Sequence, residues 1–214
     1  MPAVGRYFMK PIFSRNIDIN KIAFLNWRID KDSHILNLVN IADGFFLSAI
    51  ELTRHCLKNN DDKRADILIF PILTNVNHGL ELYLKSLNWM LNELSGNDKR
   101  IEGGHNLKQI FQTIKAKFKK YDGGITYAEF KRETISIEQY INELFDKIQA
   151  TPKNDKMDFS RYSLDNNYED HFYVLDCGTV DIDLENLAIR LEEMKQKMSN
   201  LIDFMYHYER AQRD

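Results

Sequence analysis

The sequence predicts an all-α protein, an antiparallel four- to five-helix bundle with a small β-hairpin inserted before the last helix. Apolar residues recur at alternating steps of three and four in several long segments, which is the spacing of amphipathic helices. Residues 155–180 lack this spacing and are rich in aromatic and β-branched residues, which favours strands. The chain has 214 residues, 43% of them hydrophobic, which is enough for one domain with a sizeable core.

The first helix is predicted over residues 34–57, where one apolar stripe is formed by Ile35, Leu38, Ala42, Phe45, Ala49, Leu52 and Cys56. Ser33 or Asp32 is suited to cap its start. Gly44 in its middle costs about 1 kcal/mol relative to Ala, and indicates a close approach of a neighbouring element. Residues 1–31 are interpreted as an N-terminal arm that packs on the bundle, and residues 32–214 as the bundle itself.

The second helix is predicted over residues 66–94. Pro71 lies near its start, so residues 66–70 are expected to form a separate or kinked turn. Gly96 follows its end and tolerates the positive φ of a helix terminus.

Three more helices complete the predicted bundle. The third covers residues 106–120 with Asn106 as its cap, and the fourth covers residues 134–150 and ends before a proline. The last helix is the clearest, because apolar residues keep the three-four spacing from Leu184 to Tyr208 after an N-terminal Asp183.

The hairpin is predicted to have strands near residues 159–164 and 170–175, joined by a turn at Asp165 and two asparagines. Its register decides whether Arg161 and His171 share a face. A two-residue loop separates these side chains, whereas a three-residue loop places them together. The sequence leaves both registers open.

The second helix carries a polar face. At about 100° per residue, His78, Glu81 and Lys85 lie on one side of it. One interpretation is a solvent-exposed face with a Glu81–Lys85 pair worth about 0.2–0.5 kcal/mol. The other is a contact surface, against the hairpin or another subunit, because Leu82 and Trp89 lie in the same stripe. The second interpretation favours a homodimer.

These three side chains are expected to meet His105 and Arg161 in a cationic pocket for a phosphate or nucleotide. Two simpler roles stand beside this expectation. His105 lies in a Gly-Gly-His-Asn loop that leads into a helix, where it would order the loop. Arg161 would pin the hairpin to the bundle through a carboxylate such as that of Glu81.

Composition excludes several classes of protein. The net charge of −3 argues against a surface coated with basic charge for bulk nucleic-acid binding, and the lysines of residues 108–120 are interpreted as a solvated helix face. Cys56 and Cys177 form no zinc-type cluster, so neither a metal nor a cofactor is expected. The free thiols, and the lack of a signal peptide or an 18-residue apolar run, predict a cytoplasmic protein.

Three short motifs resemble the HEPN superfamily of helical bundles. They are NHGLELYLKSLNWML at residues 77–91, GGHNL at 103–107, and SRYSLD at 160–165 ahead of the final helix. The resemblance covers roughly residues 66–211. It implies a four-helix up-and-down bundle, frequent homodimers, and a role in bacterial toxin–antitoxin, antiviral defence or stress systems. Many members are metal-independent endoribonucleases, and others bind RNA, nucleotides or a partner protein without catalysis.

The family's catalytic motif is an Arg followed, after four to six residues, by a His. The Arg holds the scissile phosphate and the His moves a proton near neutral pH. Arg28–His34 and Arg100–His105 have this spacing, but in both pairs an Ile follows the Arg. Such pairs arise by chance in a chain of this composition. Arg190 on the last helix has no His at the required distance.

The weak catalytic candidates are therefore Arg100, His105, Arg161 and His171. The preferred prediction is a HEPN-like binding module for RNA, a nucleotide or a partner subunit. One alternative is a metal-independent endoribonuclease, and another is a structural dimerisation subunit without a ligand.

Overall fold

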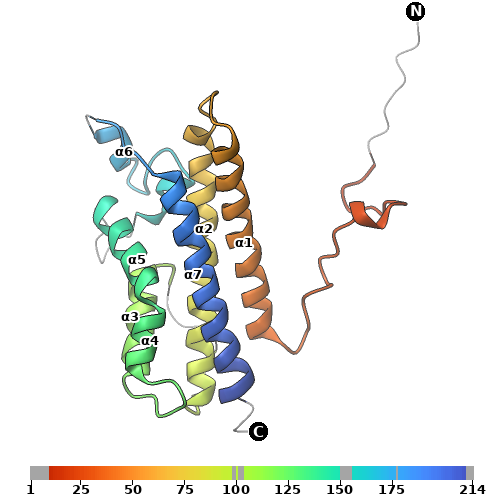
Figure 1. Ribbon diagram of the computed structural model, residues 1–214, viewed down its shortest axis with the longest axis vertical. Helices are drawn as coiled ribbons and strands as arrows, with labels where there is room; N and C mark the ends of the chain where they lie inside the picture. The colour runs from red at the N-terminus through yellow and green to blue at the C-terminus, as the bar shows by residue number, and fades with distance from the viewer. Residues whose placement is uncertain (1–9, 98–99, 101–103, 150–155, 177, 211–214) are drawn as a thin grey trace, which may run out of the picture.

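The computed structural model describes residues 10–97, 100, 104–149, 156–176 and 178–210, and over these residues the chain is all-α (Figure 1). Two long helices, α1 (His34–Lys58) and α2 (Ala65–Leu94), form an antiparallel pair. The final helix α7 (Leu184–Phe204) runs beside α1. Two shorter helices, α3 (Leu107–Phe118) and α5 (Ile135–Lys147), complete the bundle.

These five helices confirm the all-α prediction, and most of their ends fall within three residues of those predicted. Asn106 and Asp183 cap α3 and α7 as expected, since the side chain of each accepts backbone N–H hydrogen bonds. Gly96 has a φ of +67° after the end of α2. Ser33 precedes α1, but its hydroxyl donates to Asp30 at 2.8 Å and does not cap the helix.

Two helical details differ from the prediction. Pro71 lies inside α2, which continues through residues 65–94 without a break, so residues 66–70 form no separate turn. The last α-helix ends at Phe204 and widens into a π-helical turn, η3 (Met205–Glu209).

A short helix, α4 (Tyr127–Glu133), was not predicted. It begins with a capping box, in which Thr126 and Glu129 bond reciprocally to each other's backbone N–H. Thr134 ends α4 and starts α5, so the two form a bent pair against α3 and α7. Its single buried side chain, Phe130, stacks on Phe118 of α3 with ring centroids 4.0 Å apart.

The predicted β-hairpin is wrong. The described segment 156–176 contains a 3₁₀ helix η2 (Met157–Ser160), one isolated antiparallel bridge between Leu164 and Asp170, and a short helix α6 (Phe172–Leu175). The turn is held by Asp165, whose carboxylate accepts from the N–H groups of Asn167 and Glu169 at 2.7 and 3.0 Å.

Aromatic packing explains why no ladder continues from that bridge. The rings of Phe159 and Phe172 meet at 5.7 Å, and Tyr173 lies against Phe70 of α2 at 5.4 Å. Helical turns bring these neighbouring rings to the bundle together, whereas a strand would point alternate residues away from it. Since neither flank of the turn is a strand, the question of hairpin register does not arise.

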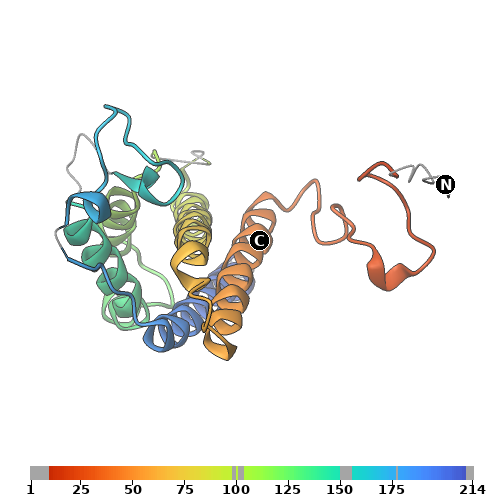
Figure 2. The same ribbon diagram turned by 90° about the horizontal axis from the view of Figure 1, so that it is seen from above.

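The N-terminal arm also differs from the expectation. Its described part, residues 10–33, includes a single 3₁₀ turn η1 (Ile19–Lys21). Seen from above, the arm leaves the bundle sideways and lies clear of it (Figure 2).

Helices α1 and α2 are each long and apolar enough, by length and composition alone, to span a membrane. Both line the core shared with α3, α5 and α7, and core helices of soluble proteins meet the same criterion.

The crossing of α1 and α2 depends on a glycine. A Cβ added at Gly79 would lie 2.8 Å from the ring of Phe46 and 3.2 Å from the carbonyl oxygen of Ala42. We expect Gly79→Ala to destabilise the protein by about 1–2 kcal/mol, because overpacking outweighs the gain in helix propensity. The measurement is the urea midpoint in dilute protein at unchanged m-value.

Gly44 provides a matched control one helix away. A Cβ at Gly44 would meet nothing within 4 Å. Gly44→Ala should therefore raise stability by up to about 1 kcal/mol. If Gly79→Ala and Gly44→Ala shifted the urea midpoint in the same direction, the close contact at Gly79 would not be the reason for the stability change there.

Candidate functional site

The polar face of α2 is built around a buried carboxylate. Glu81 is 8% exposed, and its Oε1 accepts from Lys85 Nζ at 2.7 Å and from His105 Nδ1 at 2.9 Å. Lys85 follows one helical turn after Glu81, so helix geometry alone pairs them. His105 directly precedes Asn106, the N-cap residue of α3, and the His105 side chain is 80% exposed. The Lys85 ammonium and the N–H of the His105 ring thus compensate the cost of burying Glu81.

A cavity of about 230 Å³ opens beside this carboxylate. Its walls come from α1, α2, the start of α3 and the η2 segment. The lining residues are Phe45, Thr74, Asn77, His78, Glu81, His105, Met157, Ser160 and Arg161. Residues that are far apart in the sequence therefore share one small space.

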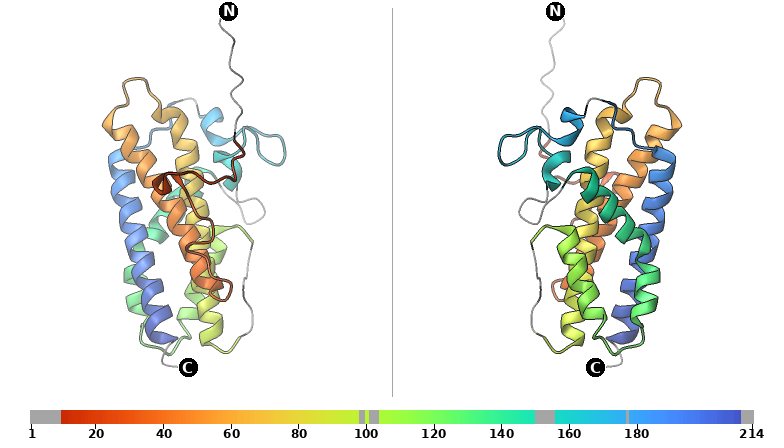
Figure 3. Two further views of the ribbon diagram at one scale, coloured as in Figure 1. Left: turned by 90° about the vertical axis from the view of Figure 1, so that its right-hand side faces the viewer. Right: turned by 90° about the vertical axis from the view of Figure 1, so that its left-hand side faces the viewer.

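The η2 segment packs against α2, and the two lie side by side in Figure 3. The hydroxyl of Thr74 lies 2.9 Å from the Ser160 hydroxyl and 3.1 Å from the Ser160 carbonyl oxygen. This contact places Arg161, the next residue, on the cavity wall. Arg161 is exposed and has no salt bridge to another described residue, and its guanidinium lies 5.7 Å from the Tyr162 ring. Its charge is available to a ligand.

Asn77 has an unmatched donor in the cavity wall. Its Oδ1 accepts from the hydroxyl of Tyr140 at 2.7 Å, while its Nδ2 has no partner among the described residues. Asn77 is only 7% exposed. Burial raises the pKa of Tyr140, so that hydroxyl stays a donor and holds the amide in this orientation. A buried N–H group without a partner costs about 1–3 kcal/mol.

His78 lies on the exposed side of the cavity. Its ring meets the ring of Phe45 edge-on, at 4.5 Å between centroids and an angle of 87°. Together with His105 and Arg161, it gives the cavity a rim of groups that can carry positive charge. The Glu81–Lys85 pair behind them is close to neutral overall.

The structure brings together the five residues expected to bind a ligand. His78, Glu81, His105 and Arg161 line the cavity, and Lys85 pairs with Glu81 directly behind it. Glu81 pairs with Lys85 and His105, so it does not hold Arg161 through an ion pair among the described residues.

The other catalytic candidates lie outside this cavity. Arg100 is exposed and does not line it. His171 is 3% exposed, and its ring lies 5.7 Å from the Tyr173 ring. It starts α6 as a packed residue, so Arg161 and His171 form no shared site. Arg28 and His34 also lie outside, with His34 stacked on Trp89 at 6.1 Å.

The apolar residues on the polar face of α2 have partners in their own chain. Trp89 is 8% exposed, and Leu82 is half-buried against the core. They do not offer the contact surface for a second copy that the sequence suggested.

Sequence reasoning missed the role of Asn77, which precedes His78. The available signal was the run of amides on an otherwise apolar helix, since Asn88 and Asn92 of α2 are also buried. Both of these amides accept from Lys117 of α3, at 2.7 Å for Asn88. The sequence did not indicate that Phe45 and Met157 line a cavity, because each is an ordinary apolar residue in its segment.

Among the described residues, no group of three His, Cys, Asp or Glu side chains is placed to hold a metal ion. Comparison of the chain with protein-family models, with curated proteins and with solved structures finds no match. The HEPN resemblance therefore stays a prediction that rests on the short motifs.

Proposed function

We propose that the protein is a HEPN-like binding module that takes one nucleotide unit, with its base in the cavity and its phosphate on the rim. The observation that carries the proposal is the cavity that Asn77 and Glu81 line and that Arg161 and two histidines edge. The unit can belong to single-stranded RNA or to a free nucleotide, and the two sources are distinguished by experiment.

The size of the cavity supports a base as its occupant. Sites that enclose drug-sized ligands measure about 300–1,000 Å³, and this cavity measures about 230 Å³. It is thus suited to part of a nucleotide. The remaining sugar and phosphate would lie at the mouth, where the charged groups are.

The wall chemistry fits the edge of a base. Asn77 and Glu81 place an amide and a carboxylate in the cavity wall, and the carboxylate offers an acceptor. Phe45 and Met157 supply apolar surface between them. Sequence-specific RNA recognition commonly uses this combination of aromatic or apolar contact with hydrogen bonds to the exposed edge of an unpaired base.

The rim chemistry fits a phosphate. Arg161 can donate two parallel hydrogen bonds to phosphate oxygens, and His105 and His78 can add donors. Few phosphate contacts are available, so affinity should fall only modestly with salt. This agrees with the net charge of −3, which does not suit broad electrostatic binding.

Fluorescence anisotropy with a labelled mixed-sequence RNA, and competition by free nucleotides, tests the proposal. Arg161→Ala should weaken binding about tenfold or more, since a charged hydrogen bond is worth about 1.5–3 kcal/mol. Asn77→Asp keeps the acceptor for Tyr140, replaces the donor, and should weaken binding as strongly.

Arg132→Ala is the matched control, because Arg132 is an exposed arginine of α4 that pairs with its neighbour Glu133. It should bind within about twofold of wild type. Competition by mononucleotides identifies a free nucleotide, and competition by RNA alone identifies a strand. Binding that resists both substitutions, or no binding to any probe, would remove the proposal.

A metal-independent endoribonuclease is the second candidate, and one observation favours it. The Glu81 carboxylate accepts from His105 Nδ1, which fixes the tautomer and leaves Nε2 to move a proton. His78 lies in the same cavity. If pure protein cleaves RNA, His105→Ala should abolish cleavage and Arg100→Ala should not. Absence of cleavage by the wild type removes this candidate and leaves binding untouched.

A further inference from the structure

The N-terminal arm exposes large apolar side chains to water. Phe13 is 89% exposed, Leu25 80% and Trp27 76%. The remaining members of the set are Ile12, Ile17, Ile19, Phe24 and Ile29. Soluble monomers rarely expose a contiguous apolar patch above a few hundred Å². These side chains therefore offer apolar surface that a partner could cover.

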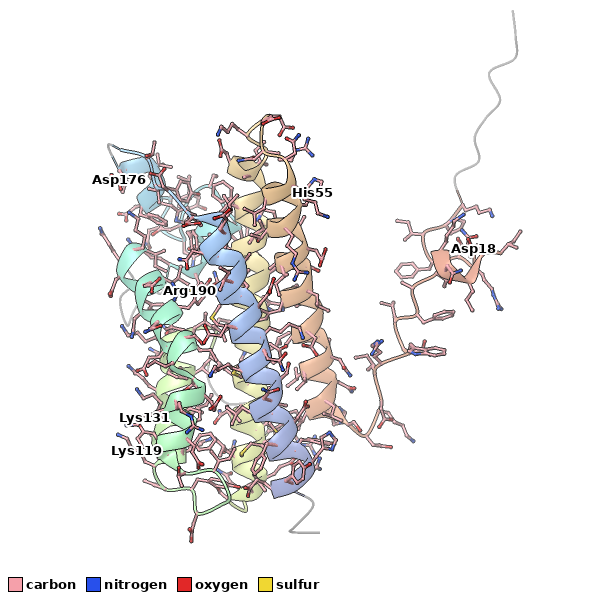
Figure 4. The ribbon with its side chains drawn as sticks, viewed as in Figure 1. Asp18, His55, Lys119, Lys131, Asp176 and Arg190 are labelled. Atoms are coloured by element: carbon pink, nitrogen blue, oxygen red, sulfur yellow. The ribbon has the colours of Figure 1, made fainter. Side chains whose placement is uncertain are left out.

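The base of the arm is fixed to α1, which sets its direction. Asn37 accepts from the backbone N–H of Asp30 at 2.9 Å and donates to the Asp30 carbonyl oxygen at 2.5 Å. Asn40 donates to the carbonyl oxygen of Arg28 at 2.6 Å. The arm therefore leaves α1 in a defined direction, away from its own bundle, with Asp18 of η1 well separated from the helices (Figure 4).

The neighbouring face of α1 is also uncovered. Ile41 is 44% exposed and Leu47 50% exposed, and a Cβ at Gly44 between them would meet nothing within 4 Å. Residues 34–50 contain one charged side chain, Asp43, which turns inward to Tyr83 and Lys195. This uncharged face with a glycine at its centre suits close packing of another helix.

A hollow of about 640 Å³ lies between the arm and this face. Its apolar walls are Phe24, Leu25 and Trp27 on the arm and Ile41 on the helix. The hollow is continuous with the Gly44 face, since Ile41 is one turn before Gly44. A helix lying on that face would contact the arm and α1 together.

We propose that two copies of the chain exchange arms, with α1 packed against α1 of the second copy near Gly44 and each arm lying over its partner's helix. Each copy carries both the uncovered face of α1 and the uncovered arm. In a dimer with a two-fold axis, the same contact therefore covers the face and the arm of both copies. A stable interface buries roughly 800 Å² per partner. The three aromatic rings in the described part of one arm, those of Phe13, Phe24 and Trp27, can alone bury roughly 450–750 Å².

Sedimentation equilibrium at micromolar concentration tests the exchange. Wild type should show twice the monomer mass of 25.3 kDa. Gly44→Glu should give a monomer that melts at or above the wild-type temperature of dilute protein, because the added side chain has open space in the monomer. The double variant Leu25→Asp with Trp27→Asp should also be monomeric. Ile189→Glu, at a 67% exposed position of α7, should stay dimeric.

Cross-linking gives a second readout of the same geometry. With Cys177 replaced by serine, Gly44→Cys should form an intermolecular disulfide on mild oxidation, since the two-fold axis passes near this residue. Cys56 is buried and should not react. A monomeric wild type, whether or not it binds lipid vesicles, overturns the proposal. So does a dimer that survives both the Gly44→Glu and the arm substitutions.

Discussion

Glu81→Ala should destabilise the protein by about 3–5 kcal/mol. The substitution leaves Lys85, whose side chain is 11% exposed, without its carboxylate. Breaking a buried pair by removing one partner costs about this much, because the remaining charge is held away from water. Chemical denaturation monitored by circular dichroism measures the loss, with the m-value as a check on two-state unfolding.

Two further variants separate charge burial from lost packing. Glu81→Leu combined with Lys85→Met removes both charges and keeps the apolar volume, so it should recover most of the stability. Arg54→Ala breaks an exposed arrangement with Glu51 and Glu192, and should cost about 0–1 kcal/mol. A loss below about 1.5 kcal/mol for Glu81→Ala would mean that water reaches Lys85 and that the pair is effectively a surface one.

The same pair links stability to the site. Glu81 also holds His105, so its removal should free that ring while the exposed Arg161 keeps its place directly after η2. RNA binding by the variant with both Glu81→Leu and Lys85→Met therefore tests whether the orientation of His105 matters separately from the charge of Arg161.

Helical periodicity predicted the positions of the long helices and the residues that share a face on each of them. The apolar stripes of α1, α2 and α7 are long, and each buries one face against the others, so their positions follow from spacing alone. The shared face of His78, Glu81 and Lys85 follows from the same 100° step. The pairing of Lys85 with Glu81 needs no tertiary information.

The spacing of apolar residues could not predict structure that depends on contacts between residues far apart in the sequence. Residues 157–176 have strand-like composition, yet Phe159, Phe172 and Tyr173 pack through helical turns around the Asp165 loop. β-propensity describes residues that fit a half-buried pleated surface, and here the aromatic contacts override it. Arg161 reaches the cavity for a different reason than predicted: the Thr74–Ser160 contact places it, and no strand register does.

The arm shows a similar limit. Its apolar residues led to the expectation that it packs on its own bundle, because burial is the usual outcome for such side chains. The amides of Asn37 and Asn40 instead fix its base in an outward direction. A run of apolar residues favours burial of a segment, but it does not say against which surface.

Helix α4 was missed because it is only seven residues long, too short for periodicity to register. Its local signal was the Thr126–Glu129 capping box, which is readable in the sequence as Thr-Tyr-Ala-Glu. The helix contributes one buried side chain to the core, that of Phe130. Phe130 is fully buried, stacks on Phe118 at 4.0 Å, and lies 6.2 Å from the ring of Phe111.

Phe130→Ala should therefore cost about 3–5 kcal/mol, the range for removing a fully buried Phe. The expected loss is large because α3, α4 and α7 meet around this ring and a seven-residue helix has little stability of its own. Phe204→Ala is the matched control. It removes the same atoms from a side chain that is 37% exposed, and should cost less than half as much.

Hydrogen exchange distinguishes local from global loss in the Phe130 variant. If α4 is held mainly by Phe130, amides of residues 127–133 should lose protection while those of α1 and α2 keep theirs, because the aromatic rings next to Phe130 belong to α3 and α4. Equal loss of protection in all helices would instead show that α4 and the long helices unfold as one cooperative unit. A cost near that of Phe204→Ala would mean that the bundle closes over the vacated space and that α4 is a passive connection between α3 and α5.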